Sequence, residues 1–248
     1  MADQADALGR DGDGPEGLAE AMDAVHLDRI LADATRLIAA PSENPGAGEG
    51  PAVEALAAMC EALGAEVMLG EVAPGRCNLH ATLGGDRAGA PIMFLGHSDV
   101  VPAGEGWTGD PFTPRIEGDR LVGRGATDMK GGIAAVLEAM RVLDELECDH
   151  PIELLVTVDE EDRATGALHY LQHAADRELL ALVVAEPTDL DTIVGCRGAA
   201  NLRLELSGRA AHAGRPSDGA NAIDAAARII ALLAEESARF EAEADGDW

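Results

Sequence analysis

The sequence predicts an α/β protein with helices on both faces of a mixed sheet, followed by the first part of a smaller α+β unit. From about residue 25 to 192, short apolar runs alternate with stretches of helical periodicity, which is typical of a sheet covered by helices. Four segments of this region place a histidine or a carboxylate just after an apolar strand. Because the carboxyl ends of strands are where sites form in open α/β sheets, these segments indicate one common site.

The expected elements follow from the periodicity and its breaks. Helices are expected over about 25–40, 51–63, 130–146, 164–175 and 219–236, and strands over 67–72, 78–83, 92–95, 152–158, 182–185 and 202–206. The segment "GGDRAGAP" between strands 78–83 and 92–95 is typical of a hairpin turn. In the strand 202–206, leucines alternate with polar residues, which predicts a half-buried strand of a more exposed sheet. Residues 1–24 are acidic and rich in glycine, so we expect a disordered tail there.

The composition limits both the core and the partners. The chain has 248 residues, of which 47% are hydrophobic and only 2% aromatic, so we expect a core of alanine, valine, leucine and isoleucine. A formal net charge of −28 repels nucleic acid and anionic membrane surfaces, which argues against both as partners. Lys130 is the only lysine, and an acidic chain almost without lysine suits a halophilic source, where salt screens the charge.

The cysteines and the N-terminus indicate an intracellular protein. Cys60, Cys77, Cys148 and Cys196 form no CxxC motif, so buried thiols in a reducing compartment are expected. The first residues lack the apolar core of a signal peptide, and no run approaches the roughly 18 apolar residues of a membrane span. We therefore expect a cytoplasmic location.

The segment "IMFLGHSDVVP" reads as a buried strand that ends at His97 and Asp99. Residues two apart in an extended stretch point to the same side, so His97 could bind a metal while Asp99 orients a neighbouring group. The alternative that this segment leaves open is a buried histidine with ordinary hydrogen bonds beside a turn aspartate.

Three further segments carry carboxylates. In "GRGATDMKGG", Asp128 stands at the start of a long helix, where it is either a metal ligand or a helix N-cap. Asp159, Glu160 and Glu161 follow the next strand, and such a cluster needs a cation or solvent to compensate its charge. Glu186 follows a further strand in "LVVAEPTDL" and could equally be an ordinary turn residue.

Taken together, one histidine and several carboxylates are expected at one edge of the sheet. This ligand set suits zinc, and also cobalt or manganese, and carboxylates can bridge two such ions. A glutamate beside the ions that is not a ligand would be the general base for a metal-bound water. The residues alone therefore predict metal-assisted hydrolysis.

Seven motifs in one order resemble a family of co-catalytic zinc metallopeptidases and deacylases. The motifs cover about residues 36–235 and are "PSENP", "GHSDVVP", "GWTGDPF", "GRGATDMKGG", "TVDEEDRATGA", "AEPTDL" and "GRAAHAGRPSDGANAI". The family includes acetylornithine deacetylase, succinyl-diaminopimelate desuccinylase, aminoacylase and glutamate carboxypeptidase. The resemblance implies a zinc-exopeptidase-like three-layer catalytic domain over 25–192 and the first part of a ferredoxin-like lid and dimerisation domain over 193–248.

The resemblance also implies the metal ligands. His97 and Glu186 are similar to the ligands of one zinc, and Glu161 to a ligand of the second zinc. Asp128 is similar to the carboxylate that bridges both ions. Two divalent metal ions, zinc above all, are therefore the expected cofactors.

Three more residues take catalytic roles by the same resemblance. Glu160 is similar to the general base that receives a proton from the bridging water, and Asp99 to the residue that orients the metal-binding histidine or its surroundings. His212, in "AAHAGRP", is similar to a lid histidine that polarises the substrate carbonyl, often from the partner subunit of a dimer. Without the resemblance, an ordinary surface histidine is the reading that the surrounding residues favour.

The implied activity is hydrolysis of an amide bond in an N-acyl amino acid or small peptide by a metal-activated water. The wording of the motifs favours the deacetylase and desuccinylase branch of amino-acid biosynthesis, with homodimerisation through a complete lid. In the family the chain returns from the lid with a last zinc-binding histidine, whereas no histidine follows His212 here. We therefore expect a C-terminally truncated or split chain that lacks the fifth ligand. An inactive fragment that retains metal or ligand binding is the alternative function.

Lys130 lies two residues after Asp128. Its compact ammonium is expected to pair with one of the carboxylates that gather at this turn.

Overall fold

A computed structural model describes residues 15–46, 48–174, 178–191, 193–195, 198 and 202–243. The chain divides into two compact units, residues 1–192 and 193–248, and each is described by itself. Among the described residues, no helix is both long and apolar enough to cross a membrane.

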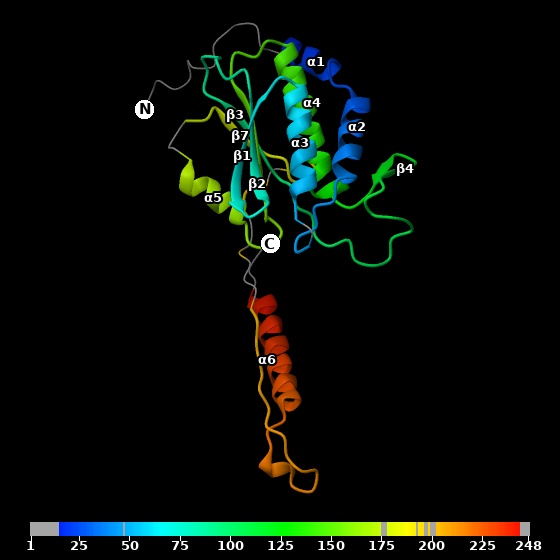
Figure 1. The fold of residues 1–248 in the computed structure, drawn as a ribbon, viewed down its shortest axis with the longest axis vertical. Coiled ribbons are helices and arrows are strands. Elements are labelled where there is room, and N and C mark those ends of the chain that lie inside the picture. Colours follow the sequence, from blue (N-terminus) through cyan, green and yellow to red (C-terminus); the bar gives the residue numbers. More distant parts are fainter. Residues whose placement is uncertain are drawn as a thin grey trace. The chain divides into compact units, whose positions relative to one another are not determined.

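The first unit combines helices with a sheet (Figure 1). Its helices are α1 (Pro15–Asp23), α2 (Leu27–Ile38), α3 (Gly50–Ala62), α4 (Gly131–Glu145) and α5 (Thr165–His173), with a short turn η1 (Ala126–Lys130) before α4. The sheet strands are β1 (Glu66–Ala73), β2 (Arg76–Leu83), β3 (Ile92–His97), β6 (Ile152–Thr157) and β7 (Ala181–Val184). A separate two-stranded sheet consists of β4 (Arg115–Glu117) and β5 (Arg120–Val122).

The large sheet has the order β1-β2-β6-β3-β7 and is mixed. The pairs β1–β2 and β2–β6 are antiparallel, whereas β3 runs parallel to both β6 and β7. All six residues of the central strand β6 are buried, as expected for a strand covered on both faces. Since β3, β6 and β7 are parallel, the segments that follow them leave the sheet at the same edge.

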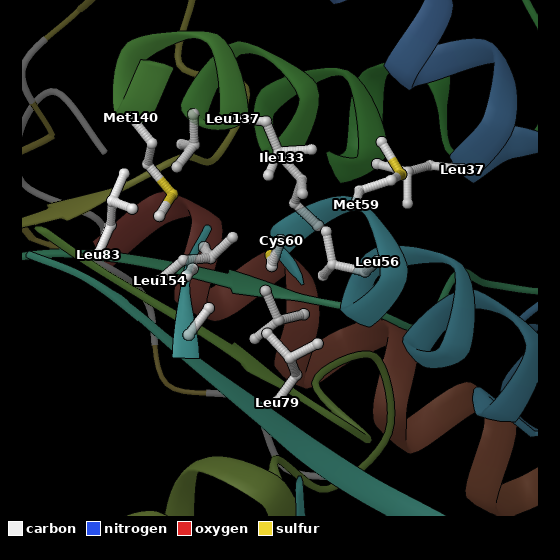
Figure 2. Close-up of a cluster of buried hydrophobic side chains, with 14 of the residues drawn as sticks. Leu37, Leu56, Met59, Cys60, Leu79, Leu83, Ile133, Leu137, Met140 and Leu154 are labelled. Carbon is white, nitrogen blue, oxygen red and sulfur yellow. The ribbon is translucent and has the colours of Figure 1, made fainter. Parts of the chain in front are cut away.

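The helices form layers on both sides of the sheet, which confirms the predicted α/β class. Figure 1 shows α2, α3 and α4 on one side and α5 on the other. Figure 2 shows the core on the first side, where Leu137 and Ile133 of α4 and Leu56 of α3 face Leu79 and Leu154 of the sheet. Three methionines and a cysteine are also buried in this core: Met59, Cys60, Met129 and Met140. The expectation of a core of alanine, valine, leucine and isoleucine was therefore too narrow.

Two expectations for the first unit are wrong. Strands β2 and β3 do not form a hairpin around "GGDRAGAP", because β6 lies between them in the sheet; the hairpin is instead β1–β2, which turns at Pro74 and Gly75. Part of the expected disordered tail, Pro15–Asp23, is the helix α1. The rest of that tail, residues 1–14, lies outside the described residues.

The second unit contains a short turn η2 (Pro216–Asp218) and the long helix α6 (Ala222–Glu243). The half-buried strand expected over 202–206 is absent from the described residues, and Leu202, Leu204 and Leu206 are exposed. A strand needs a neighbour for its backbone groups, and the described residues of this unit offer only one bridge, between Arg209 and Ala220.

Candidate metal centre

Three parallel strands deliver the candidate ligands to one edge of the sheet. His97 ends β3 and is paired in register with Thr157, which ends β6. Glu160 and Glu161 follow three and four residues after Thr157, and Glu186 follows two residues after the end of β7. The prediction that one sheet edge collects these segments is thus explained by the parallel order of the strands.

Asp128 reaches the same edge from η1 rather than from a helix. Gly125 begins this turn with φ +82°, a left-handed conformation that suits glycine. Asp128 itself is extended, with φ −121° and ψ 102°, and the Asp128–Met129 peptide is cis. Helix α4 starts later, at Gly131, with Lys130 at the N-cap position and no side-chain cap hydrogen bond. Asp128 is therefore not the N-cap of α4.

The side chains of these segments converge on the imidazole of His97. Its Nε2 atom lies 3.0 Å from Asp128 Oδ1, 3.6 Å from Glu186 Oε1 and 3.9 Å from Glu160 Oε2. Two sets of three potential ligand atoms each lie within 4.8 Å of one another: His97 with Asp128 and Glu161, and His97 with Glu160 and Glu186. His97 is buried, whereas the carboxylates are partly exposed, so the cluster is open to solvent on the carboxylate side.

Asp99 lies beneath the cluster and is fully buried. Its carboxylate accepts hydrogen bonds from the backbone amides of Glu160 and Glu161, both at 3.1 Å, and its backbone oxygen lies 2.9 Å from His97 Nδ1. Burial alone would raise the pKa of Asp99, but hydrogen bonds with His97, Asn44 and the two amides outweigh burial and lower this pKa to about 2. Asp99 thus contacts the groups that the sequence suggested it would orient.

The electrostatics of the cluster favour a cation. Burial would lower the pKa of His97, but its hydrogen bond with Asp99 and the charges of Glu186, Asp99 and Glu160 raise the pKa to about 9. Burial raises the pKa of Glu161 and of Glu186, and repulsion from neighbouring carboxylates raises both further. A bound cation would relieve this repulsion between the carboxylates, so the excess of negative charge around His97 is typical of a cation site.

The donor set fits a divalent metal. One imidazole nitrogen and several carboxylate oxygens are ligands that zinc and related ions prefer. Nδ1 of His97 already contacts a backbone oxygen, so Nε2 is the nitrogen that faces the carboxylates and is free to bind a metal. His97, Asp128, Glu161 and Glu186 would hold the metal. Glu160 belongs to the second set of potential ligands, so geometry alone allows it to be a ligand or a base.

Close packing sets the position of Glu186. A Cβ atom on Gly132, in the first turn of α4, would lie 2.2 Å from the backbone oxygen of Ala185. Only glycine therefore lets α4 approach the segment that carries Glu186. This glycine belongs to the same "GRGATDMKGG" motif as Asp128.

The expected pairing of Lys130 with a carboxylate is wrong. Its Nζ donates to the backbone oxygen of Ala40 at 2.7 Å, and no salt bridge joins it to a carboxylate among the described residues. Lys130 is 1% exposed, and burial lowers its pKa to about 8. The lysine joins η1 to the end of α2.

Four polar residues support the cluster, and the sequence singled out only one of them, Asp159, as a third carboxylate of the cluster itself. Asp159 does not face His97; its carboxylate accepts from Asn44, Arg76 and Thr165. Glu49 pairs with Arg76 and accepts the amide of Asp159. Asn44 lies in the motif "PSENP", which was the one available signal, while Glu49 and Arg76 come from segments whose proximity only the fold determines.

His212 belongs to the second unit and is exposed. The amide of Gly214 donates to its Nδ1 at 3.0 Å. The hydrogen of the neutral ring is then on Nε2, which makes this nitrogen a donor.

The profile of the peptidase family M20/M25/M40 matches residues 93–245, which is more than half of the chain and includes all seven predicted site residues. The chain belongs to this family. The family resemblance predicted from the ordered motifs is thereby confirmed.

Two curated relatives resemble the chain over most of its own length. It is 39% identical to the succinyl-diaminopimelate desuccinylase of Rhizorhabdus wittichii over 213 residues, which is 80% of this chain and 54% of the relative. It is 34% identical to the acetylornithine deacetylase of Aliivibrio salmonicida over 187 residues, 75% of this chain and 49% of the relative. The chain thus spans about half the length of the curated relatives it matches.

Two solved structures share the fold of the chain. Human carnosine dipeptidase 1 matches with a TM-score of 0.60 and 24% identity, over 67% of this chain and 40% of that structure. A tripeptidase from Staphylococcus aureus matches with a TM-score of 0.56 and 21% identity, over 84% of this chain and 57% of that structure.

Proposed function

We propose that the chain carries the metal centre of an M20 hydrolase that cleaves an amide bond in an N-acyl amino acid or small peptide. The observation that supports this most is the convergence of Asp128, Glu160 and Glu186 on Nε2 of His97 at 3.0, 3.9 and 3.6 Å. The named relatives, a desuccinylase and a deacetylase, favour an N-acyl amino acid as the substrate class.

In this proposal four residues hold two divalent metal ions, zinc first and cobalt or manganese as substitutes. His97 and Glu186 would hold one ion, Glu161 would hold the other, and Asp128 would contribute its carboxylate to both. When bound, the ions supply Lewis-acid polarisation of the amide carbonyl and lower the pKa of the attacking water. The protein's part is to hold the ligands in place, which Asp99 does through His97 and the amides of Glu160 and Glu161.

Glu160 is the proposed general base. Its backbone is fixed by the hydrogen bond to Asp99, whereas its carboxylate is about half exposed and accepts no hydrogen bond within the described residues. Oε2 is therefore available to take a proton from water and to pass it to the leaving amine. The balanced reaction consumes one amide and one water and releases a carboxylate and an amine.

His212 is the proposed donor to the oxygen of the reacting carbonyl. Its Nδ1 is occupied by the amide of Gly214, so Nε2–H is the donor that remains. In the proposal this histidine acts from the lid, across a homodimer when the lid is complete. The strong acidity of the chain and its single lysine support a cytoplasm of high salt as its setting.

Hydrolysis by the Glu160→Gln variant tests the proposal. The 248-residue chain with Zn²⁺ or Co²⁺, in concentrated KCl, is expected to release the amine from N-succinyl or N-acetyl amino acids. Glu160→Gln should lose at least about 100-fold in kcat, the usual share of a general base, while binding metal as the wild type does. If the variant hydrolyses like wild type, Glu160 is not the base; if it loses the metal, Glu160 is a ligand.

A further inference from the structure

We propose that Asn44 is a positioning residue of the metal centre. Its side-chain amide joins the buried carboxylates of Asp99 and Asp159, and these two fix the turn that carries Glu160 and Glu161. The proposal rests on the proposed function only in that the cluster around His97 binds a metal.

The amide of Asn44 contacts both carboxylates at the same distance. Its Nδ2 donates to Asp99 Oδ2 at 2.9 Å and to Asp159 Oδ1 at 2.9 Å. Asn44 is 7% exposed, and both aspartates are more deeply buried. One NH₂ group has two hydrogens, so both are used inside the protein.

The charge of the two aspartates makes a shared donor favourable, and it adds to the hydrogen bonds that Asp159 accepts from Arg76 and Thr165. Like charges repel strongly in a buried setting, where water screens them little. A donor that is shared between two carboxylates lets them approach one another and satisfies a lone pair on each. Without it, the two carboxylates would lose their common link and move apart or admit water.

Each aspartate controls one part of the catalytic turn. Asp99 accepts the amides of Glu160 and Glu161, and its backbone oxygen contacts His97 Nδ1. Asp159 precedes Glu160 and has φ 65°, a left-handed conformation that is unfavourable for a residue other than glycine and persists only when its surroundings hold it. The link through Asn44 therefore couples the support of His97 to the support of the glutamates.

Asn44 is itself held in place by the backbone. The backbone nitrogen of Asn44 donates to the backbone oxygen of Val100 at 2.9 Å, and the backbone nitrogen of Val100 donates to the backbone oxygen of Ser42 at 3.0 Å. The segment of Asn44 therefore runs beside the residue that follows Asp99. The side chain reaches the two carboxylates from a fixed base rather than from a free loop.

Metal affinity in two variants, with Asn78 as a matched control, tests the proposal. Asn78 is another buried asparagine that links segments: it donates to Gly166 O at 2.8 Å and accepts the amide of Val158 at 3.1 Å, and it has no hydrogen bond with a carboxylate among the described residues. Asn44→Ala removes the link, whereas Asn44→Asp keeps the volume but replaces the donor by an acceptor. Co²⁺ is titrated into the 248-residue wild type and each variant, and binding is followed by the visible spectrum of Co²⁺. Unfolding by denaturant is measured on the metal-free samples.

We expect Asn44→Ala to weaken Co²⁺ binding by about 10–100-fold, the usual effect of losing a partner of metal ligands. Asn44→Asp should weaken it at least as much. Asn78→Ala should lower stability comparably and leave the Co²⁺ affinity unchanged. Wild-type affinity for Co²⁺ in Asn44→Asp, or an equal loss of affinity in Asn78→Ala, would overturn the role of Asn44 but leave the proposed function untouched. Failure of the wild-type chain to bind Co²⁺ would overturn the proposed function and this inference with it.

Discussion

The ammonium of Lys130 donates to the backbone oxygen of Ala40 at 2.7 Å, and this contact explains why an almost lysine-free chain contains one lysine. The buried site offers one carbonyl acceptor to the side chain. An ammonium on a thin stem fits such a site, whereas a planar guanidinium has five donors to satisfy and more volume to place. The lysine thus ties the turn that presents Asp128 to the segment that follows α2.

Replacing Lys130 by arginine should therefore destabilise the protein. We expect Lys130→Arg to lower the free energy of unfolding by about 1–3 kcal/mol, through overpacking and unsatisfied donors in a buried position. The reverse exchange at an exposed position, Arg120→Lys, should change it by less than about 0.5 kcal/mol. Denaturant unfolding measures both, and equal stability of Lys130→Arg and wild type would show that the site tolerates arginine.

A methyl group at Gly132 should disturb the metal centre. Its Cβ would meet the backbone oxygen of Ala185 at 2.2 Å, so Gly132→Ala must shift α4 or the segment that carries Glu186. We expect a loss of about 1–3 kcal/mol in stability and weaker metal binding. Gly70→Ala is the control, because nothing lies within 4 Å of a Cβ there, and it should be neutral or stabilising. Unchanged metal affinity in Gly132→Ala would contradict the assignment of Glu186 as a ligand.

The fold predicts an order of thiol reactivity. Burial raises the pKa of Cys60 to about 12, with a smaller opposing effect of Arg141, so its thiol stays protonated in the folded chain. At pH 8.5 a thiol reagent should modify the partly exposed Cys77 and Cys148 first, and Cys60 only at the rate of unfolding. Mass spectrometry of the labelled peptides gives the order.

The stability contributed by Cys60 should also depend on pH in one direction. The unfolded chain ionises this thiol near its ordinary pKa, while the folded chain does so only at about 12. Between these values the folded state binds more protons, so the stability that this thiol contributes is lost as pH rises. The difference in unfolding free energy between wild type and Cys60→Ala should thus decrease above pH 9, and an increase would contradict the burial of the thiol.

Salt should stabilise the chain. At a net charge of −28, repulsion opposes the folded state, and screening by KCl weakens that repulsion. Raising KCl from about 0.1 to 1 M, which shortens the screening length from about 10 to 3 Å, should raise the Tm by several degrees. Sucrose in place of KCl controls for general exclusion effects. A Tm that stays constant or falls with KCl would contradict the halophilic interpretation.

The sequence was informative where one segment carries its own signal. Apolar runs that precede His97, Glu161 and Glu186 predicted strands β3, β6 and β7, and also predicted that these candidate ligands meet at one edge, because parallel strands share an edge. It failed where the answer depends on pairing between distant segments. No residue near β2 or β3 in the sequence indicates that β6 lies between them. Because it does, the connection from β2 to β3 is a crossover and not the expected hairpin.

The polar support of the site was hidden for the same reason. Asn44 contacts aspartates 55 and 115 residues away, and Lys130 contacts a carbonyl 90 residues away. Asp159 looked like a third carboxylate of a cluster, but its left-handed backbone turns it toward Arg76 instead. The strand expected over 202–206 did not form because alternation specifies a face but supplies no neighbouring strand.

Metal content is the most direct test of the central claim, that His97 and its surrounding carboxylates form a divalent metal site. The 248-residue chain is loaded with Zn²⁺ and dialysed against metal-free buffer in concentrated KCl, and its zinc content is measured by mass spectrometry. We expect at least one zinc per chain in the wild type, retention of zinc in Glu160→Gln, and its loss in His97→Ala. A wild-type chain without zinc, or a His97→Ala variant that retains wild-type zinc, would contradict the account.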